Sequence, residues 1–254
     1  MTIVIETAEA IARIQIARPE RKNAITAAMY AALAEAVAAA EADESVRVIL
    51  LHGQPDVFTA GNDLEDFLRT PPQQQDAPVF QFMAALSGAA KPVVAAVNGA
   101  AVGIGTTLLL HCDLVYCADD SRFSLPFVNL GLCPEFGSSL LLPLAAGYHR
   151  AAEKLLLGEP ASAEEALELG LVNRILPPGE VLALAKRQCA RLALLPPTAL
   201  RETKRLLKAG WREATARAIG DESAAFVRLL QSADAREAFR VFLDRRAPDS
   251  SKPR

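Results

Sequence analysis

The chain has 254 residues, of which 51% are hydrophobic and 22% are charged. This composition is that of an ordinary globular protein and excludes a mostly disordered chain. With 27 Lys and Arg against 30 Asp and Glu, the net charge of -3 provides no positive field, so we expect no nucleic-acid partner. The four cysteines form no CxxC pair and only three histidines are present, so we expect no metal site.

The first 20 residues lack the basic-then-apolar order of a secretory signal, so we expect a cytoplasmic protein with reduced thiols. The uncharged stretch 92–110 is long enough to span a bilayer. However, it contains a proline, an asparagine and three glycines, which favour a buried strand, turn and helix. We therefore expect no membrane contact.

Strands and helices alternate in the first two thirds of the chain, which predicts an α/β fold. Thr26 is placed to cap a helix that extends to about Ala42. Strands are predicted at 13–17, 46–51, 93–97 and 113–117. The run VRVILL at 46–51 is nearly all apolar, which is typical of a strand buried on both faces.

From about residue 135 onward the pattern is helical. Helices are predicted at 138–146, 150–157, 163–169, 181–194, 198–209 and 211–230. The segment 197–245 has more apolar positions than it can bury alone, so it either folds back onto the body or packs against another subunit. We therefore expect a core at 1–196, a C-terminal helical oligomerisation region at 197–245 and a disordered tail at 246–254.

Two glycine-containing turns each follow a predicted buried strand. The first includes Gly61, and Asp63 is placed to cap a short helix at 64–68. The second includes Gly103 and leads into an apolar helix, whose first N–H groups lack partners within the helix. Two such turns facing one another would form an oxyanion hole, although ordinary tight turns have the same pattern. The second turn lacks the third glycine of a dinucleotide-binding fingerprint, so we do not expect a Rossmann nucleotide site.

Five collinear segments resemble signatures of the enoyl-CoA hydratase/isomerase (crotonase) superfamily. They are 18–24 (RPERKNA), 59–64 (TAGNDL), 91–99 (KPVVAAVNG) continued by 103–105 (GIG), 112–114 (CDL) and 163–173 (AEEALELGLVN). This resemblance implies a crotonase-like spiral of ββα turns with a C-terminal helical trimerisation region. It also implies acyl-CoA thioester substrates and a homo-trimer or hexamer.

The resemblance also implies site residues. The oxyanion hole falls on the backbone N–H groups of Asn62 and Ile104. Arg245 occupies a position that is usually Lys in the family, and it keeps the positive charge. The positions that match substrate-binding or CoA-binding stretches are Lys22, Ala24, Ala60, Gly61, Asp63, Leu64, Gly103, Phe127, Pro134, Phe226 and Arg245.

The two glutamates of the family's hydratases are absent, because Thr107 and Phe127 stand at those positions. Glu135, in the segment CPEFGSS, resembles instead the single catalytic base of the Δ3,Δ2-enoyl-CoA isomerase branch. Its apolar neighbours should raise its pKa toward the range where it can take and return a proton. Residue type alone leaves a second interpretation open, in which Glu135 is an acidic residue at the start of a helix. The resemblance favours the catalytic role.

The resulting expectation is an isomerase that moves a double bond from the 3,4 to the 2,3 position. Glu135 would remove the α-proton, and Asn62 and Ile104 would stabilise the enolate. No cofactor is expected, since coenzyme A is part of the substrate. The alternatives are a hydratase in which Glu135 acts through water and an acyl-CoA-binding protein without turnover. His52 and His111 are expected to be packed, hydrogen-bonded residues.

The acyl-chain length is not predicted. Four residues are candidates for shaping the pocket of the acyl tail, beside the loop 69–78. They are Phe67, Phe80, Phe82 and Met83.

Overall fold

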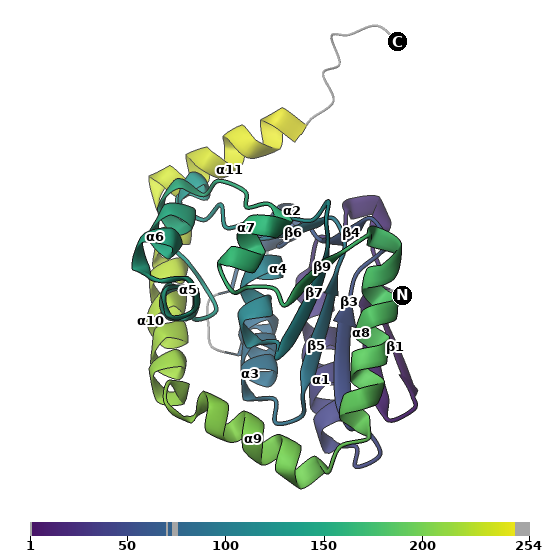
Figure 1. Cartoon of the computed structure of the whole chain (residues 1–254). Coiled ribbons are helices and arrows are strands. Elements are labelled where there is room, and N and C mark those ends of the chain that lie inside the picture. Colours follow the sequence, from purple (N-terminus) through teal and green to yellow (C-terminus); the bar gives the residue numbers. More distant parts are fainter. Residues whose placement is uncertain (1, 70, 73–75, 247–254) are drawn as a thin grey trace, which may run out of the picture.

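The computed structural model describes residues 2–69, 71–72 and 76–246, with side chains up to Phe242. Its centre is a six-stranded sheet in the order β1-β2-β3-β5-β7-β9 (Figure 1). The strands are β1 (Ile3–Ala8), β2 (Ile11–Ile16), β3 (Val48–His52), β5 (Val93–Val97), β7 (Leu114–Ala118) and β9 (Arg174–Leu176). β1 and β2 pair antiparallel and every other neighbouring pair is parallel. The buried runs of β3 and β5 occupy central positions, as their sequences predict.

A second sheet of three short parallel strands has the order β4-β6-β8. The strands are β4 (Val57–Thr59), β6 (Ala100–Val102) and β8 (Arg122–Ser124). Each follows a strand of the main sheet along the chain and precedes a helix or 3-10 turn. This repeat is the expected spiral of strand-strand-helix turns, although the short strands themselves were not predicted.

Helices cover both faces of the main sheet. The α-helices are α1 (Ala27–Ala42), α2 (Leu64–Arg69), α3 (Pro78–Gly88), α4 (Ile104–Thr107), α5 (Ser138–Ala146), α6 (Tyr148–Leu157), α7 (Ala163–Glu168), α8 (Pro178–Ala193), α9 (Pro197–Ala209), α10 (Arg212–Leu230) and α11 (Ala233–Arg246). Three 3-10 turns are η1 (Pro19–Arg21), η2 (Leu108–His111) and η3 (Val128–Leu130). One core lies between the sheet and the pair α1 and α3, and a second lies beneath α8 (Figure 1).

The predicted ends of the elements agree with the structure where a residue such as a helix cap marks them in the sequence. The Thr26 side chain accepts a hydrogen bond from the Met29 N–H and caps α1, which ends at Ala42 as predicted. The apolar helix predicted after the second glycine turn is instead the four-residue α4 followed by η2. Residues 247–254, which belong to the predicted disordered tail, lie outside the described part of the chain.

The C-terminal helices partly pack on their own chain. α10 contacts α5, and α11 contacts α10 and η3. Phe226 and Phe239 are buried in a third core with residues of the segment 125–155. Leu206 and Leu207 of α9 remain exposed. Within the described residues, no helix is long and apolar enough to cross a membrane.

Candidate active site

The two glycine turns lie side by side at one end of the small sheet. β4 and β6 are parallel neighbours, so the turns that follow them leave the sheet at the same edge. A Cβ on Gly61 would stand 2.6 Å from the Val102 carbonyl oxygen, and a Cβ on Gly105 would stand 2.4 Å from Thr59 Cγ2. Gly61 has a φ of +82°, which also favours glycine. Only glycine therefore permits this approach of the two backbones.

The N–H group of Asn62 directly follows Gly61, and that of Ile104 lies between Gly103 and Gly105. Ile104 is fully buried and begins α4, where N–H groups have no partner within the helix. Asn62 lies in an isolated parallel bridge with Ile25, whose hydrogen bonds use Gly61 O and Asp63 N. Across the described residues, neither the Asn62 N–H nor the Ile104 N–H has a hydrogen-bond acceptor. Two such adjacent donors fit the requirement of an oxyanion hole.

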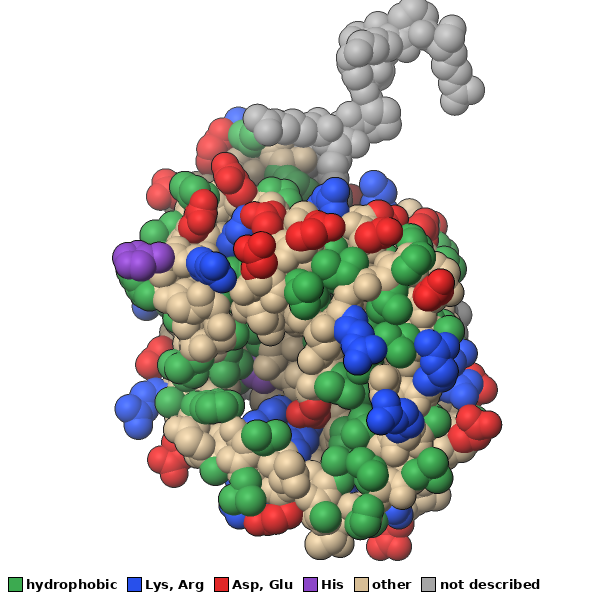
Figure 2. Space-filling model, in the orientation of Figure 1, with side chains coloured by type: hydrophobic (Ala, Val, Ile, Leu, Met, Phe, Trp, Pro, Cys, Tyr) green, Lys and Arg blue, Asp and Glu red, His purple; other side chains and the backbone are tan. Residues whose placement is uncertain are grey.

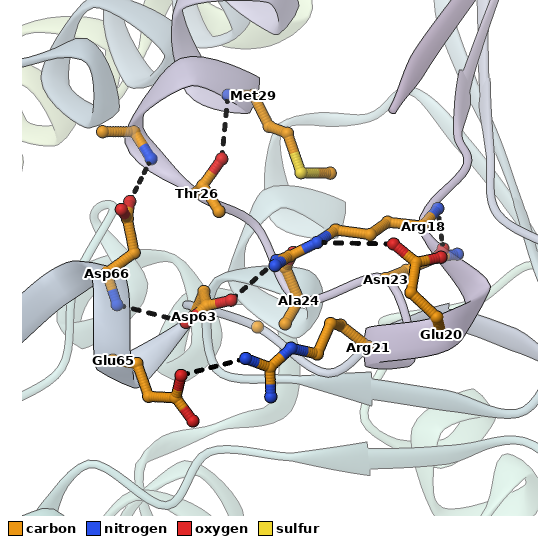
Figure 3. Close-up of polar contacts among 12 residues, drawn as sticks. Arg18, Glu20, Arg21, Asn23, Ala24, Thr26, Met29, Asp63, Glu65 and Asp66 are labelled. Carbon is orange, nitrogen blue, oxygen red and sulfur yellow. Dashed lines mark hydrogen bonds and ion pairs between the residues drawn. The ribbon is translucent and has the colours of Figure 1, made fainter. Parts of the chain in front are cut away.

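Ion pairs attach the loop before α1 to the first of these turns (Figure 3). Arg18 donates to Asp63 Oδ2 at 2.7 Å and to the Ala24 carbonyl at 2.8 Å. Asp63 Oδ1 accepts from the Asp66 N–H at 3.1 Å, so Asp63 caps α2 as predicted. Burial alone would raise the pKa of Asp63, but the hydrogen bond and charge of Arg18 and the Asp66 N–H hold it below its usual range. Both carboxylate oxygens of Asp63 therefore make hydrogen bonds that stabilise the fold.

Four more of the predicted CoA-binding positions lie where the loop before α1 meets the first glycine turn. The Lys22 carbonyl accepts from the Ala60 N–H at 3.0 Å, and the Lys22 side chain is exposed. Ala24 is buried, whereas Ala60 and Leu64 are half-buried. The structure thus brings the positions from Lys22 to Leu64 into one neighbourhood.

Glu135 is a buried residue that lines a narrow cavity. It is 5% exposed, and its Oε1 has no hydrogen-bond partner among the described residues. The cavity has a volume of about 10 Å³ and is lined by Phe67, Pro72, Val79, Phe80, Met83, Glu135, Ser223 and Phe226. Burial, and next the charge of Glu222, raise the pKa of Glu135 to about 8. A carboxyl group in this state can accept and return a proton near neutral pH.

Three of the four residues proposed for the acyl-tail pocket line this cavity, namely Phe67, Phe80 and Met83. Phe82 instead lies in the core, with its ring centroid 5.9 Å from that of Tyr30. A larger cavity of about 490 Å³ shares Phe67, Pro72 and Val79 with the narrow one and extends to Asp63 and Arg69. Its volume suits a small-molecule site.

The start of α5 is capped by Glu222 rather than by Glu135. The Glu222 carboxylate accepts from the Gly137 N–H and, at 2.8 Å, from the Ser139 N–H. α5 begins at Ser138, and Ser138 Oγ donates to the Glu135 carbonyl at 2.6 Å. The side-chain hydrogen bonds at the start of α5 are thus made by Glu222, and Glu135 is left to line the cavity.

Glu222 and Tyr30 were not identified from the sequence. Glu222 lies four positions before the buried Phe226 on α10, and a charged residue on the buried face of a helix was the available signal. The Tyr30 hydroxyl donates to Asn62 Oδ1, and Tyr30 is buried on α1. Burial, with a smaller effect of the Glu135 charge, raises the pKa of Tyr30 well above its usual value. Tyr30 therefore lies between the two predicted parts of the site.

The hydratase positions provide no acid or base. Thr107 is fully buried, with its hydroxyl 3.5 Å from the Ile104 carbonyl, and Phe127 is 4% exposed. A Cβ on Gly103 would meet the Phe127 ring at 4.0 Å. Phe127 therefore forms an apolar wall beside the second turn.

The remaining predicted positions lie near Glu135 or beyond the described side chains. Pro134 is half-buried directly before Glu135. Phe226 packs edge-on against Phe67, with ring centroids 6.0 Å apart. Arg245 belongs to α11, but its side chain lies outside the described residues. Within the described part of the chain, no cluster of three or more His, Cys, Asp or Glu residues suits a metal ion.

Comparison with known proteins shows the family and the fold of this chain. Residues 6–252 match the family model described as enoyl-CoA hydratase/isomerase, and the chain belongs to this family. The structure of Pseudomonas aeruginosa OdaA is 48% identical with a TM-score of 0.93, over 95% of this chain and 98% of that chain. An enoyl-CoA hydratase/isomerase from Pseudoalteromonas atlantica T6c is 38% identical, also with a TM-score of 0.93, over 98% of this chain and 99% of that chain. The chain therefore has the crotonase fold.

The names of curated relatives include both reactions. Human enoyl-CoA delta isomerase 2 is 35% identical over 219 residues, which are 84% of this chain and 55% of that protein. The chain thus spans about half the length of this relative. The Escherichia coli 2,3-dehydroadipyl-CoA hydratase is 30% identical over 250 residues, which are 97% of each chain.

Proposed function

We propose that this enzyme isomerises 3-enoyl-CoA thioesters to 2-enoyl-CoA thioesters. The observation that carries the proposal is the state of Glu135, a buried carboxyl group with a free oxygen and a pKa of about 8 in an apolar cavity. The adjacent N–H groups of Asn62 and Ile104 support it, because they fit the thioester oxygen on which negative charge develops.

The proposed reaction moves one proton and a pair of double-bond electrons. Glu135 takes a proton from C2, and the C–H electrons form a dienolate whose oxygen accepts hydrogen bonds from Asn62 and Ile104. The same carboxyl group gives the proton to C4, and the double bond comes to lie between C2 and C3. Stabilising the dienolate is essential, because a thioester α-proton is too weakly acidic for an unaided carboxylate. The net reaction requires no redox cofactor or metal.

Isomerisation is favoured over hydration because the site offers one carboxyl group where hydration needs two positioned groups. Thr107 and Phe127 can neither deprotonate water nor protonate C2. A hydratase is the runner-up reaction, since relatives of both names match the chain.

An absorbance assay with the purified protein tests the proposal. Addition of 3-enoyl-CoA should increase the absorbance of the conjugated thioester, while 2-enoyl-CoA should leave it nearly unchanged. A fall with 2-enoyl-CoA and no rise with 3-enoyl-CoA would indicate a hydratase. Binding of CoA in a titration without either absorbance change would indicate a binding protein. The hydratase pattern and the binding-only pattern would each contradict the proposed isomerase. Repeating the assay over chain lengths would define the acyl specificity.

We further propose that the chain forms a trimer or a dimer of trimers. The exposed side chains of Leu206, Leu207 and Trp211 lie on or directly after α9. Leu207 and Trp211 line a hollow of about 430 Å³ between α5, α9 and the central sheet, which Figure 2 shows on this face of the molecule. Exposed apolar surface of this kind is typical of subunit contacts. Sedimentation of a stable monomer at micromolar concentration would contradict this proposal.

A further inference from the structure

The backbone directly after Glu135 has an unusual conformation. Phe136 has a φ of +61°, which is rare for a bulky residue, and Gly137 follows with a φ of +73°. Such a turn persists only where its surroundings hold it, and residues of this kind concentrate at functional sites. The contacts that hold this turn therefore also position the side chain of Glu135.

Two side chains from distant elements hold the turn. His111 of η2 stacks on the Phe136 ring with centroids 4.0 Å apart, and its Nε2 donates to the Phe136 carbonyl at 2.7 Å. Burial lowers the pKa of His111 to about 4, so the ring is neutral near pH 7. On the other side, Glu222 of α10 accepts from the Gly137 and Ser139 N–H groups. His111 thus contributes ring stacking and one hydrogen bond, and Glu222 contributes a buried carboxylate.

We infer that Glu222 is a positioning residue for the proposed base: its carboxylate fixes the turn that carries Glu135 and places a second negative charge beside it. The inference rests on the proposed function for its kinetic consequence. The C-terminal helix α10 then serves the active site of its own chain, because Glu222, Ser223 and Phe226 all lie at the Glu135 cavity or its turn.

The charge of Glu222 acts on Glu135 in a largely apolar space. The titratable groups that face Glu135 from neighbouring elements are Tyr30 on α1, Cys133 on its own loop and Glu222 on α10. Burial raises the pKa of Tyr30 and that of Cys133, so both are neutral near pH 7. α2 and α3 contribute apolar groups such as Phe67 and Met83. Of these facing groups, Glu222 is the one whose oxygens accept hydrogen bonds from two backbone N–H groups, which favour its charged form.

The consequence is a stronger base. A nearby negative charge disfavours ionisation of Glu135 and raises its proton affinity. The N–H groups of Gly137 and Ser139 and the start of α5 favour the charged form of Glu222, although its own burial raises its pKa. The N–H contacts thus favour the charged form of Glu222, whereas burial and the charge of Glu222 favour the protonated form of Glu135.

The test measures the ionisation of Glu135 directly, by carbon-13 NMR of its carboxyl group across pH. In Glu222→Gln, which keeps the size of the side chain, the midpoint for Glu135 should fall by about one pH unit. Glu222→Asp keeps the charge and should retain most of the wild-type midpoint. Asp221→Asn removes an exposed charge one position away and should leave the midpoint unchanged.

The pH profile of kcat/KM with 3-enoyl-CoA provides the second measurement. In Glu222→Gln its midpoint should move to lower pH, and its plateau should fall because a weaker base reacts more slowly. An unchanged Glu135 midpoint in folded Glu222→Gln, or an equal fall in Glu222→Asp, would overturn the inference. If the midpoint falls as expected but the wild type has no isomerase activity, the charge effect stands and the proposed function fails.

Discussion

Gly61 and Val102 lie so close that a Cβ on Gly61 would stand 2.6 Å from the Val102 carbonyl oxygen. This contact joins the turn after β4 to the last residue of β6. It sets the spacing between the Asn62 and Ile104 N–H groups, which lie one and two residues beyond the contact. The proposed oxyanion hole therefore requires glycine at position 61, where any other residue would add a Cβ.

Gly61→Ala should damage both stability and turnover. The added methyl group would clash with backbone, and a φ of +82° is unfavourable for alanine. We expect a loss of about 1 to 3 kcal/mol in the free energy of unfolding, measured by urea denaturation. Gly179→Ala is the matched control, since nothing lies within 4 Å of its Cβ and it stands in α8. A Gly61→Ala variant as stable and active as Gly179→Ala would contradict the described approach of the two turns.

Substitutions at Ile104 separate its main chain from its side chain. Ile104→Pro removes the N–H group at the first position of α4, where proline is tolerated. We expect kcat to fall by roughly 10² to 10³-fold, the usual effect of losing one oxyanion donor. Ile104→Val keeps the N–H and should retain nearly full activity.

Circular dichroism and CoA affinity must first show that Ile104→Pro is folded and binds. A folded Pro variant with the full wild-type rate would mean that this N–H does not stabilise the transition state.

The elements that could be predicted are those with a local signal. The run VVAAV at 93–97 forms β5 over those same residues, and Thr26 caps α1 as its side chain suggests. Strands β4, β6 and β8 have three residues each, which is too short to show a period. They are held by parallel pairing with one another, which sequence patterns do not reveal.

The residues of the candidate site likewise divide into those with a local sequence signal and those that only folding brings together. Asn62, Ile104 and Glu135 were identified because each lies in a short segment that resembles the family. Glu222 lies 85 positions after the Gly137 N–H that it binds, and folding alone brings the two together. The positive φ of Phe136 had no signal either, because the residue type does not favour it.

The raised pKa of Glu135 has a consequence for stability. Between pH 4.5 and about 8 the folded protein retains a proton on Glu135 that the unfolded chain releases. The unfolded state then binds fewer protons, so stability falls as pH rises through this window. Glu135→Gln cannot ionise and should escape this loss.

The stability advantage of Glu135→Gln over wild type should therefore grow by about 2 to 4 kcal/mol from the acid to the alkaline end of the window. Urea denaturation at each pH provides the measurement. Glu213→Gln, at an exposed position on α10, is the matched control variant. An advantage of Glu135→Gln that is constant with pH would mean that Glu135 ionises at its ordinary pKa.

The most direct test of the proposed mechanism follows the α-proton itself. Wild-type enzyme in deuterated solvent should exchange the α-protons of 3-enoyl-CoA and convert it to 2-enoyl-CoA. Glu135→Gln keeps the size of the side chain but cannot accept a proton at neutral pH. We expect both exchange and isomerisation to collapse in this variant, while CoA-thioester affinity stays within a few-fold of wild type. If Glu135→Gln exchanges and isomerises as fast as the wild type, Glu135 is not the base and the proposed mechanism is wrong.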